Sequence, residues 1–370
     1  MTYLIRESNQ NDKNLINDFN KELENQGLNI RLPTPHSENL NINNLIFQNS
    51  FILIENKITV RAGYTLKSQW FKVHDKLLQV GYYYRPVSAG LFNKKYNICG
   101  VLLLNDAQKK NPNLFGLGMG SYSEPLPQLF KSLNWKLQKV PFFFKVHRPN
   151  LFLKNIKYLK NTKLKSFLIS LLLYSSLGWL FIKFTFIISS LANFRLKRKQ
   201  SVVIKEIVEF GKELDLIWEN SKQYYSFIAV RNSEYLKTLY SDVKFIKLKF
   251  VVNNRVVGWS ISLCTKLNNH NYFGYMKLGS IVDCLSLKGY ETTIIKETSK
   301  ILKNKGADLI ISNQSHILWK NAFKMNSFIN GPSNFIFASS KVLYDKLMSN
   351  IKLKDHIHLT RGDGDGPINL

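Results

Sequence analysis

The sequence has few acidic residues and very few cysteines for its length. Its 370 residues contain 25 Asp and Glu against 52 Lys and Arg, which gives a formal net charge of +27. The three cysteines, Cys99, Cys264 and Cys284, are widely spaced without a CxxC pair. This argues against a disulfide framework or a structural zinc site and favours a reducing compartment. The first residues lack a basic start followed by an apolar core, so no signal peptide is expected.

The excess of basic residues is unevenly distributed. Residues 151–200 contain ten Lys or Arg and no Asp or Glu, and Phe167–Ile182 within them is uncharged and strongly apolar. About 20 apolar residues span a bilayer, but Lys183 would be costly near the centre of a span. Three interpretations stay open: a segment on an anionic membrane surface through residues 154–199, a buried interdomain helix, and a true span. No RRM, KH, zinc-finger or helix-turn-helix pattern is present, so specific nucleic-acid binding is not expected.

Hydrophobic periodicity predicts two similar series of elements. The first series contains strands at Tyr3–Glu7, Phe51–Glu55, Ile58–Leu66, Leu77–Tyr84, Leu114–Met119 and Val140–Val146, and helices at Asp12–Gln26, Ile98–Lys110 and Leu126–Leu133. The second contains strands at Val202–Ile207, Phe245–Val252, Val256–Cys264, Lys277–Asp283, Ala307–Ser312 and Asn334–Ser339, and helices at Lys212–Lys222, Thr292–Lys305 and Ile317–Met325. We therefore expect α+β domains at 1–150 and 201–345, a basic, apolar helical linker at 151–200 and a Gly/Asp-rich tail at 346–370.

Several stretches of both halves resemble the GNAT acyltransferases. Phe51-Ile-Leu-Ile-Glu-Asn-Lys-Ile-Thr-Val-Arg-Ala-Gly and Val251-Val-Asn-Asn-Arg-Val-Val-Gly-Trp resemble the family's central hairpin. Phe130-Lys-Ser-Leu-Asn-Trp-Lys and Lys320-Asn-Ala-Phe-Lys-Met-Asn-Ser-Phe resemble its closing helix, which normally ends in Leu-Gly-Phe. The whole chain is similar to bacterial GNAT-like proteins associated with polysaccharide biosynthesis. The resemblance implies two tandem domains, each a mixed, mainly antiparallel sheet flanked by helices.

The resemblance also implies a site for acetyl-CoA or another acyl-CoA, and no metal. GNAT enzymes hold the CoA pyrophosphate at a helix N-terminus, where backbone N–H groups and the helix dipole favour an anion. In the first half, the stretch similar to the family's Gln/Arg-x-x-Gly-x-Gly/Ala pattern comprises Lys95, Tyr96, Asn97, Ile98, Cys99 and Gly100, with Ile98 in place of a glycine. The second half keeps only Lys288 and Gly289 before its helix. The first is the better candidate, and a degenerate loop that binds nothing is the main alternative.

The acceptor site is expected where the family's central strands diverge. Asn313, Ser315 and His316 follow an apolar strand there, and His316 is the candidate base, with Asp283 as a second catalytic candidate. Asn313 and Ser315 are candidate substrate-binding residues, as is His270 in a loop. The structural alternatives are helix capping by Asn313 and Ser315 and surface positions for both histidines. Cys284 is more readily an inert core residue than a nucleophile.

Two Gly-rich stretches have structural explanations. The glycines of Gly116-Leu-Gly-Met-Gly-Ser are expected to allow close packing, although a ligand could also approach there. Arg361-Gly-Asp-Gly-Asp-Gly has acidic spacing but lacks the closing Glu of a calcium loop, so a tail that folds back over a domain is expected.

Together these features predict an acyl-CoA-dependent N-acyltransferase that acts on an amino sugar or aminoacyl acceptor, in the cytoplasm and peripherally at the inner face of the plasma membrane. Two alternatives are a catalytically silent GNAT-like binding or scaffold module at the membrane, and an aminoacyl transferase of the cell-wall type.

Overall fold

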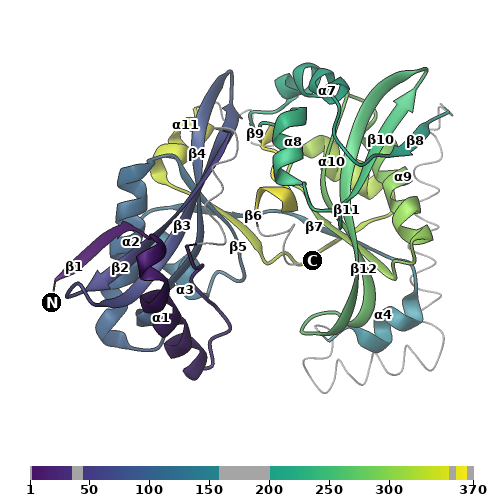
Figure 1. The fold of residues 1–370 in the computed structure, drawn as a ribbon. Helices are drawn as coiled ribbons and strands as arrows, with labels where there is room; N and C mark the ends of the chain where they lie inside the picture. Colours follow the sequence, from purple (N-terminus) through teal and green to yellow (C-terminus); the bar gives the residue numbers. More distant parts are fainter. Residues whose placement is uncertain (1, 36–44, 158–200, 350–355, 365–370) are drawn as a thin grey trace. The chain divides into compact units, whose positions relative to one another are not determined.

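We describe a computed structural model of the protein, which covers residues 2–35, 45–157, 201–349 and 356–364 (Figure 1). Of the expected linker at 151–200, residues 158–200 lie outside these described residues. Within them, no helix is long and apolar enough to cross a membrane. The chain forms two compact units, which we describe separately: residues 1–139 with 334–354, and residues 140–333 with 355–370.

The first unit is a mixed sheet with helices packed against it (Figure 1). Its strand order is β1-β2-β3-β4-β5-β15-β6. The strands are β1 (Tyr3–Glu7), β2 (Ile46–Glu55), β3 (Thr59–Val73), β4 (Lys76–Ser88), β5 (Leu114–Met119), β6 (Lys136–Lys139) and β15 (Phe335–Ser339). The helices are α1 (Lys13–Asn25), α2 (Asn97–Lys110), α3 (Pro125–Ser132) and α11 (Lys341–Met348). Neighbouring strands are antiparallel except for the parallel pair β4–β5.

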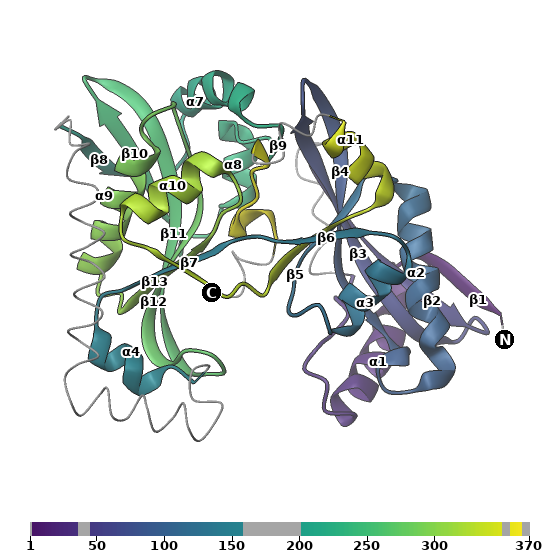
Figure 2. The same cartoon turned by 180° about the vertical axis from the view of Figure 1, so that it is seen from behind.

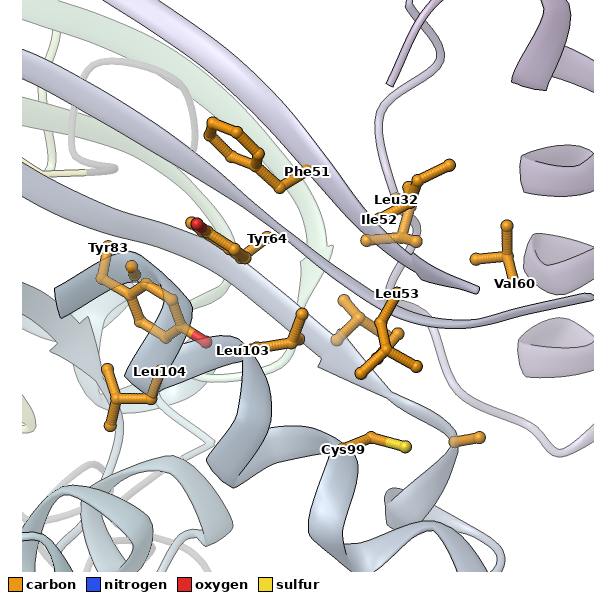
Figure 3. Packing of buried hydrophobic residues seen from close by; sticks show 14 of the residues in the cluster. Leu32, Phe51, Ile52, Leu53, Val60, Tyr64, Tyr83, Cys99, Leu103 and Leu104 are labelled. Atoms are coloured by element: carbon orange, nitrogen blue, oxygen red, sulfur yellow. The ribbon is translucent and has the colours of Figure 1, made fainter. Parts of the chain in front are cut away.

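The core of this unit lies between the sheet and helices α1 and α2. Tyr64 of β3 lies between Phe51 of β2 and Tyr83 of β4, with ring centroids 5.0 and 5.1 Å away. Leu103 and Leu104 of α2 close over these rings (Figure 3). This packing fixes α2, and with it the backbone groups at the start of that helix, against the ends of β3 and β4.

The second unit repeats the arrangement, with the strand order β14-β7-β13-β12-β11-β10-β8 (Figure 2). These strands are β7 (Phe142–Val146), β8 (Val203–Glu206), β10 (Ile246–Val252), β11 (Arg255–His270), β12 (Gly274–Ser286), β13 (Leu309–Asn313) and β14 (Ile329–Gly331). A further short strand is β9 (Phe227–Ala229). The helices are α4 (Pro149–Asn155), α7 (Glu213–Ser221), α8 (Ser233–Leu239), α9 (Glu291–Asn304) and α10 (Ile317–Met325). The pair β12–β13 is parallel, like β4–β5.

Each sheet is completed by a strand from the other half of the sequence. β15 lies between β5 and β6 of the first sheet, while β7 lies between β13 and β14 of the second. The expected division into contiguous domains at residues 150, 200 and 345 is therefore not the one observed. The strands expected at Val140–Val146 and Asn334–Ser339 do not join the sheet of their own half of the sequence. A proline supplies a physical reason, because Pro141 follows β6 and Pro332 follows β14. Proline fixes φ near −65°, so it cannot adopt the positive φ of a type I′ hairpin, and this disfavours a two-residue turn back along the same sheet.

The short turns agree with the sequence. Asn56-Lys57 and Asn253-Asn254 have positive φ at both residues (49° and 68°, 48° and 59°), as the central residues of a type I′ turn require. Asn253-Asn254 alone connect β10 to β11, whereas Ile58 also lies between β2 and β3. The closing helices also end as the GNAT resemblance implies. Asn134 and Ser327 have φ of 61° and 63° at the position of the usual glycine. The aromatic residue that follows packs back onto the helix, with Trp135 stacked on Phe130 at 4.2 Å and Phe328 edge-on to Phe323 at 4.9 Å.

Candidate functional site

The central parallel strands diverge in both units. In the first unit, only Gly81 with Leu114 and Tyr82 with Phe115 form the β4–β5 ladder, although β4 continues to Ser88. In the second unit, the β12–β13 ladder covers Leu278–Ser280, and β12 continues to Ser286. Just past this point, each long strand also carries an extra residue. In β4 it lies opposite Gly63-Thr65 of β3, and in β12 it lies opposite Ile261-Ser262 of β11. Such bulges bend a strand and redirect its backbone groups.

In the first unit, β4 leads through two 3-10 turns into α2, whose first turn has no acidic residue. Lys94 and Lys95 are exposed in the second of these turns, directly before the helix. Asn97 and Ile98 are exposed in the first helical turn, whereas Tyr96 and Cys99 are buried in the core. Figure 3 shows Cys99 in this core. Glu55, the nearby carboxylate, is bonded to Arg61 (2.8 Å) and to the Tyr96 hydroxyl (3.2 Å), which holds its pKa below the usual value. The helix start therefore has two exposed lysines and no acidic residue in its first turn, and Lys95 Nζ lies over the Tyr96 ring, 5.5 Å from its centroid.

In the second unit, a segment of the C-terminal tail contacts both diverging strands. Thr360 forms an antiparallel bridge with Gln314, just after β13, and Ile357 forms a parallel bridge with Phe227 of β9. Arg361 donates from Nη1 to Asn313 Oδ1 at 2.9 Å. Gly362 lies so close to β12 that a Cβ atom would come within 3.3 Å of Asp283 Cβ and would overlap the Tyr240 hydroxyl. The tail thus folds back onto a domain, as expected, and fills the region where the strands separate.

No protein-family model and no curated protein matches the chain. Among solved structures, a GCN5-related N-acetyltransferase from Anabaena variabilis matches 91% of this chain and 72% of its own, with a TM-score of 0.50 at 7% identity. A protein of unknown function from Enterococcus faecalis, described as a probable N-acyltransferase, matches 93% of this chain and 74% of its own, with a TM-score of 0.53 at 12% identity. A glucosamine N-acetyltransferase region of a fungal β-N-acetylglucosaminidase matches 91% of this chain and 38% of its own, with a TM-score of 0.51 at 12% identity.

The chain has the GNAT fold twice. Both sheets share one strand order, in which β15 and β7 hold equivalent positions and each comes from the other half of the sequence. This organisation confirms the fold inferred from the sequence. The two units differ at the start of the helix that follows the long fourth strand, α2 in the first unit and α9 in the second. The start of α2 in the first unit is open to solvent and cationic, whereas the second unit supplies its own groups there.

A glutamate occupies the helix start of the second GNAT unit. Glu291 is the first residue of α9, is only 6% exposed, and accepts the Gly289 N–H at 2.9 Å. Burial raises the pKa of this carboxyl group. The N–H groups and dipole of a helix start normally attract a phosphate, but here a carboxylate of the chain already uses one of them. The start of α9 thus holds a carboxylate of the chain, whereas the first turn of α2 has no acidic residue.

The residues near the start of α10 that were predicted from the sequence to bind or activate the acceptor form hydrogen bonds within the fold. His316 is buried at the N-cap of α10, where Nδ1 accepts the Leu318 N–H (3.3 Å) and Nε2 faces the Tyr224 carbonyl (3.2 Å). Both ring nitrogens are thus bound to backbone, and His316, not Asn313 or Ser315, caps the helix. Ser315 bonds the tail at the Ile357 carbonyl and the Leu359 N–H. A proton acceptor at this position would first have to lose these bonds.

Asp283 is part of a buried ionic cluster. Its Oδ2 lies 2.6 Å from Arg231 Nε and accepts the Tyr240 hydroxyl at 2.7 Å. The other side of Arg231 donates from Nη2 to Asp363 of the tail at 2.6 Å. Burial raises the pKa of Asp283 to about 6, and Arg231 opposes that rise. The aspartate therefore holds the tail through Arg231, a role that the sequence did not indicate.

Two further candidates lie elsewhere or are inert. His270 is the last residue of β11, beside the turn that leads into β12, and its Nδ1 accepts the Tyr272 N–H at 3.2 Å. Since Asp283 follows Gly274 by nine positions along β12, that turn is roughly 30 Å from the diverging end. Cys284 is buried, and burial raises the pKa of its thiol well above the usual value, which suits a core residue. Among the described residues, no group of three His, Cys, Asp or Glu side chains is arranged to hold a metal ion.

The glycine that shapes the first unit's helix start is Gly90, which the sequence analysis missed. A Cβ on Gly90 would lie 2.9 Å from the Tyr96 carbonyl oxygen and 3.1 Å from Asn97 Cα. Gly100, by contrast, lies inside α2, and its Cβ would meet only Leu129 at an ordinary 3.5 Å. Gly116 packs against Phe130, while Gly118 and Gly120 have positive φ, so the Gly116–Gly120 stretch is explained by backbone and packing.

We expect Gly90→Ala to lower the free energy of unfolding by about 1–3 kcal/mol, because the new methyl group must displace the start of α2. The matched variant Gly100→Ala is expected to raise it by up to about 1 kcal/mol, because alanine favours the helix interior. Urea unfolding of both full-length variants, followed by far-ultraviolet circular dichroism, measures the difference. Equal midpoints would show that Gly90 does not constrain the turn.

Proposed function

We propose that the chain is an acyl-CoA-dependent N-acyltransferase whose donor binds at the first unit. The contrast between the units carries the proposal: the start of α2 is exposed, lacks acidic residues and is preceded by Lys94 and Lys95. The equivalent start of α9 already contains a carboxylate. A CoA pyrophosphate is an anion that helix N–H groups and lysines both favour.

The reaction proposed is transfer of the acyl group from the thioester to an amine. The amine nitrogen forms the amide bond, the carbon–sulfur bond breaks, and the amine proton leaves through a base while CoA departs as the thiol. We propose that the thioester lies where β4 diverges from β5, next to the β4 bulge. An amino sugar or an aminoacyl group, in polysaccharide biosynthesis, is the proposed acceptor. The support for this part is the resemblance of the chain to proteins of that context.

Charge reversal before α2 tests the donor site. Lys94→Glu with Lys95→Glu is expected to weaken acetyl-CoA binding at least about tenfold, because charge-assisted hydrogen bonds to phosphate are lost and repulsion is added. Calorimetric titration of the full chain measures the affinity. The control, Lys296→Glu with Lys300→Glu, makes the same charge change on the exposed face of α9 and should bind like the unaltered protein.

A catalytically silent binding module is the second candidate, favoured by Ile98 in the place of a glycine and by the filled second unit. The same titration separates the two. Saturable binding of acetyl-CoA or a longer acyl-CoA that the Lys94/Lys95 variant loses supports the enzyme. Absence of heat at millimolar acyl-CoA, in a protein with the expected circular dichroism, supports the silent module and removes the enzyme proposal.

A further inference from the structure

One end of the second unit is built from two segments that are distant in sequence. Helix α4 lies against the lower end of the β11–β12 hairpin (Figure 1). The Lys157 N–H donates to the Tyr272 carbonyl at 3.0 Å, and Lys157 Nζ donates to Asn269 Oδ1 at 2.6 Å. Gly274 lies so close to Asn155 that a Cβ would overlap its carbonyl oxygen. We refer to residues 149–157 and 264–277 as the hairpin end.

The hairpin end exposes aromatic and basic side chains together. Tyr272 is 48% and Tyr275 58% exposed, and both stand at or beside the hairpin turn. Lys154, Lys157 and Lys266 of the hairpin end are exposed as well. Tyrosine has an apolar ring with a polar tip, and lysine an apolar stem with a charged tip, so both suit the boundary between water and lipid.

The charge of this region has one sign. The hairpin end, residues 149–157 and 264–277, contains four Lys and no Asp or Glu. Asp308, an acidic residue that packs beside them, is engaged by Arg148 at 3.2 Å and by the Lys277 N–H at 2.7 Å. Residues 201–249 of the same unit, in contrast, contain eight basic and seven acidic residues. The positive field is therefore a property of the hairpin end and not of the whole unit.

We propose that the hairpin end is a docking surface for an anionic lipid bilayer. Tyr272 and Tyr275 enter the headgroup boundary, and Lys154, Lys157 and Lys266 contact lipid phosphates. The chain leaves this surface at Lys157 and continues into a sequence with eight Lys or Arg, no acidic residue and the uncharged stretch Phe167–Ile182 between residues 158 and 200. That composition suits the same surface. The proposal does not depend on acyl transfer.

Vesicle co-sedimentation of the full chain tests whether the lysines of the hairpin end contribute to binding of anionic lipid. We expect binding to vesicles of phosphatidylcholine with phosphatidylglycerol and much weaker binding to phosphatidylcholine alone. Lys154→Gln with Lys266→Gln is expected to reduce the partition coefficient about 30-fold, since each lysine at an anionic surface accounts for roughly a fivefold change. The control, Lys296→Gln with Lys300→Gln on α9, should bind like the unaltered protein. Equal partition of the two variants would overturn the proposal.

A fluorescent probe tests the contact itself, in case residues 158–200 bind lipid alone. In a Cys264→Ser background, Tyr272→Cys carries an environment-sensitive dye, and Leu216→Cys, exposed on α7, carries the same dye as control. We expect a blue shift on anionic vesicles at position 272 and none at position 216. Binding without a shift at position 272 would show that another part of the chain meets the bilayer, which would also overturn the proposal.

Discussion

Asp363→Ala is expected to lower the free energy of unfolding of the second unit by about 3–5 kcal/mol, the usual effect of removing one partner from a buried ion pair. The Asp363 side chain is fully buried and lies 2.6 Å from Arg231, whose side chain is only 1% exposed. Its other oxygen accepts the Thr360 N–H at 2.8 Å. The substitution therefore leaves a buried guanidinium with one carboxylate, Asp283, and leaves the turn of the tail without its cap.

Chemical denaturation, followed by the fluorescence of the buried Trp259 and Trp319 of that unit, measures this loss. Asp363→Asn keeps the shape and one acceptor, so an intermediate loss is expected. Asp345→Ala, on the exposed side of α11, removes the same charge and should change the free energy by less than about 0.5 kcal/mol. If Asp363→Ala behaved like Asp345→Ala, the tail would not hold the diverging strands.

The same cluster shows what the sequence could and could not predict. Asp283 and the tail were both singled out, but Arg231 was not, because its pairing with Asp363 joins residues 132 positions apart. No local pattern of residues indicates such a partner. Burial also changes the meaning of polar residues. Asn313, Ser315 and His316 suggested a reactive strand end, whereas the tail and nearby backbone use their hydrogen-bonding groups.

Local features of the fold were predicted well, because their causes are local. β1, β5 and α10 have the expected bounds, and both Asn-containing hairpin turns form where expected. Strand partners were not predicted. Phe142–Val146 and Phe335–Ser339 are both short, apolar and aromatic. Hydrophobic periodicity and composition therefore predict that each is a strand, but not which sheet it joins. The signal that was available is Pro141, since proline cannot adopt the positive φ of the type I′ turn that commonly returns a strand to the same sheet.

This exchange leads to a prediction about fragments. A fragment of residues 1–157, which follows the sequence division, is expected not to unfold cooperatively. It lacks β15, so β5 and β6 lose the strand between them, and the buried Phe115 and Leu117 lose Phe337 as a neighbour. Residues 142–146 could replace β15 only by turning back at Val140-Pro141, which proline disfavours.

A rearranged fragment should instead fold alone. Its chain runs from residue 2 to Lys139, then through a Gly-rich turn of about four residues to Phe335 and on to Ser349. The turn is short because β6 and β15 are antiparallel neighbours, with Lys139 opposite Ile336. We expect a cooperative thermal transition and a dispersed amide spectrum for this fragment, and neither for residues 1–157. Phe337→Asp in the rearranged fragment should abolish both, because Phe337 is 2% exposed between two strands. Cooperative folding of residues 1–157 would mean that Phe142–Val146 can close its own sheet and that the exchange is not imposed by Pro141.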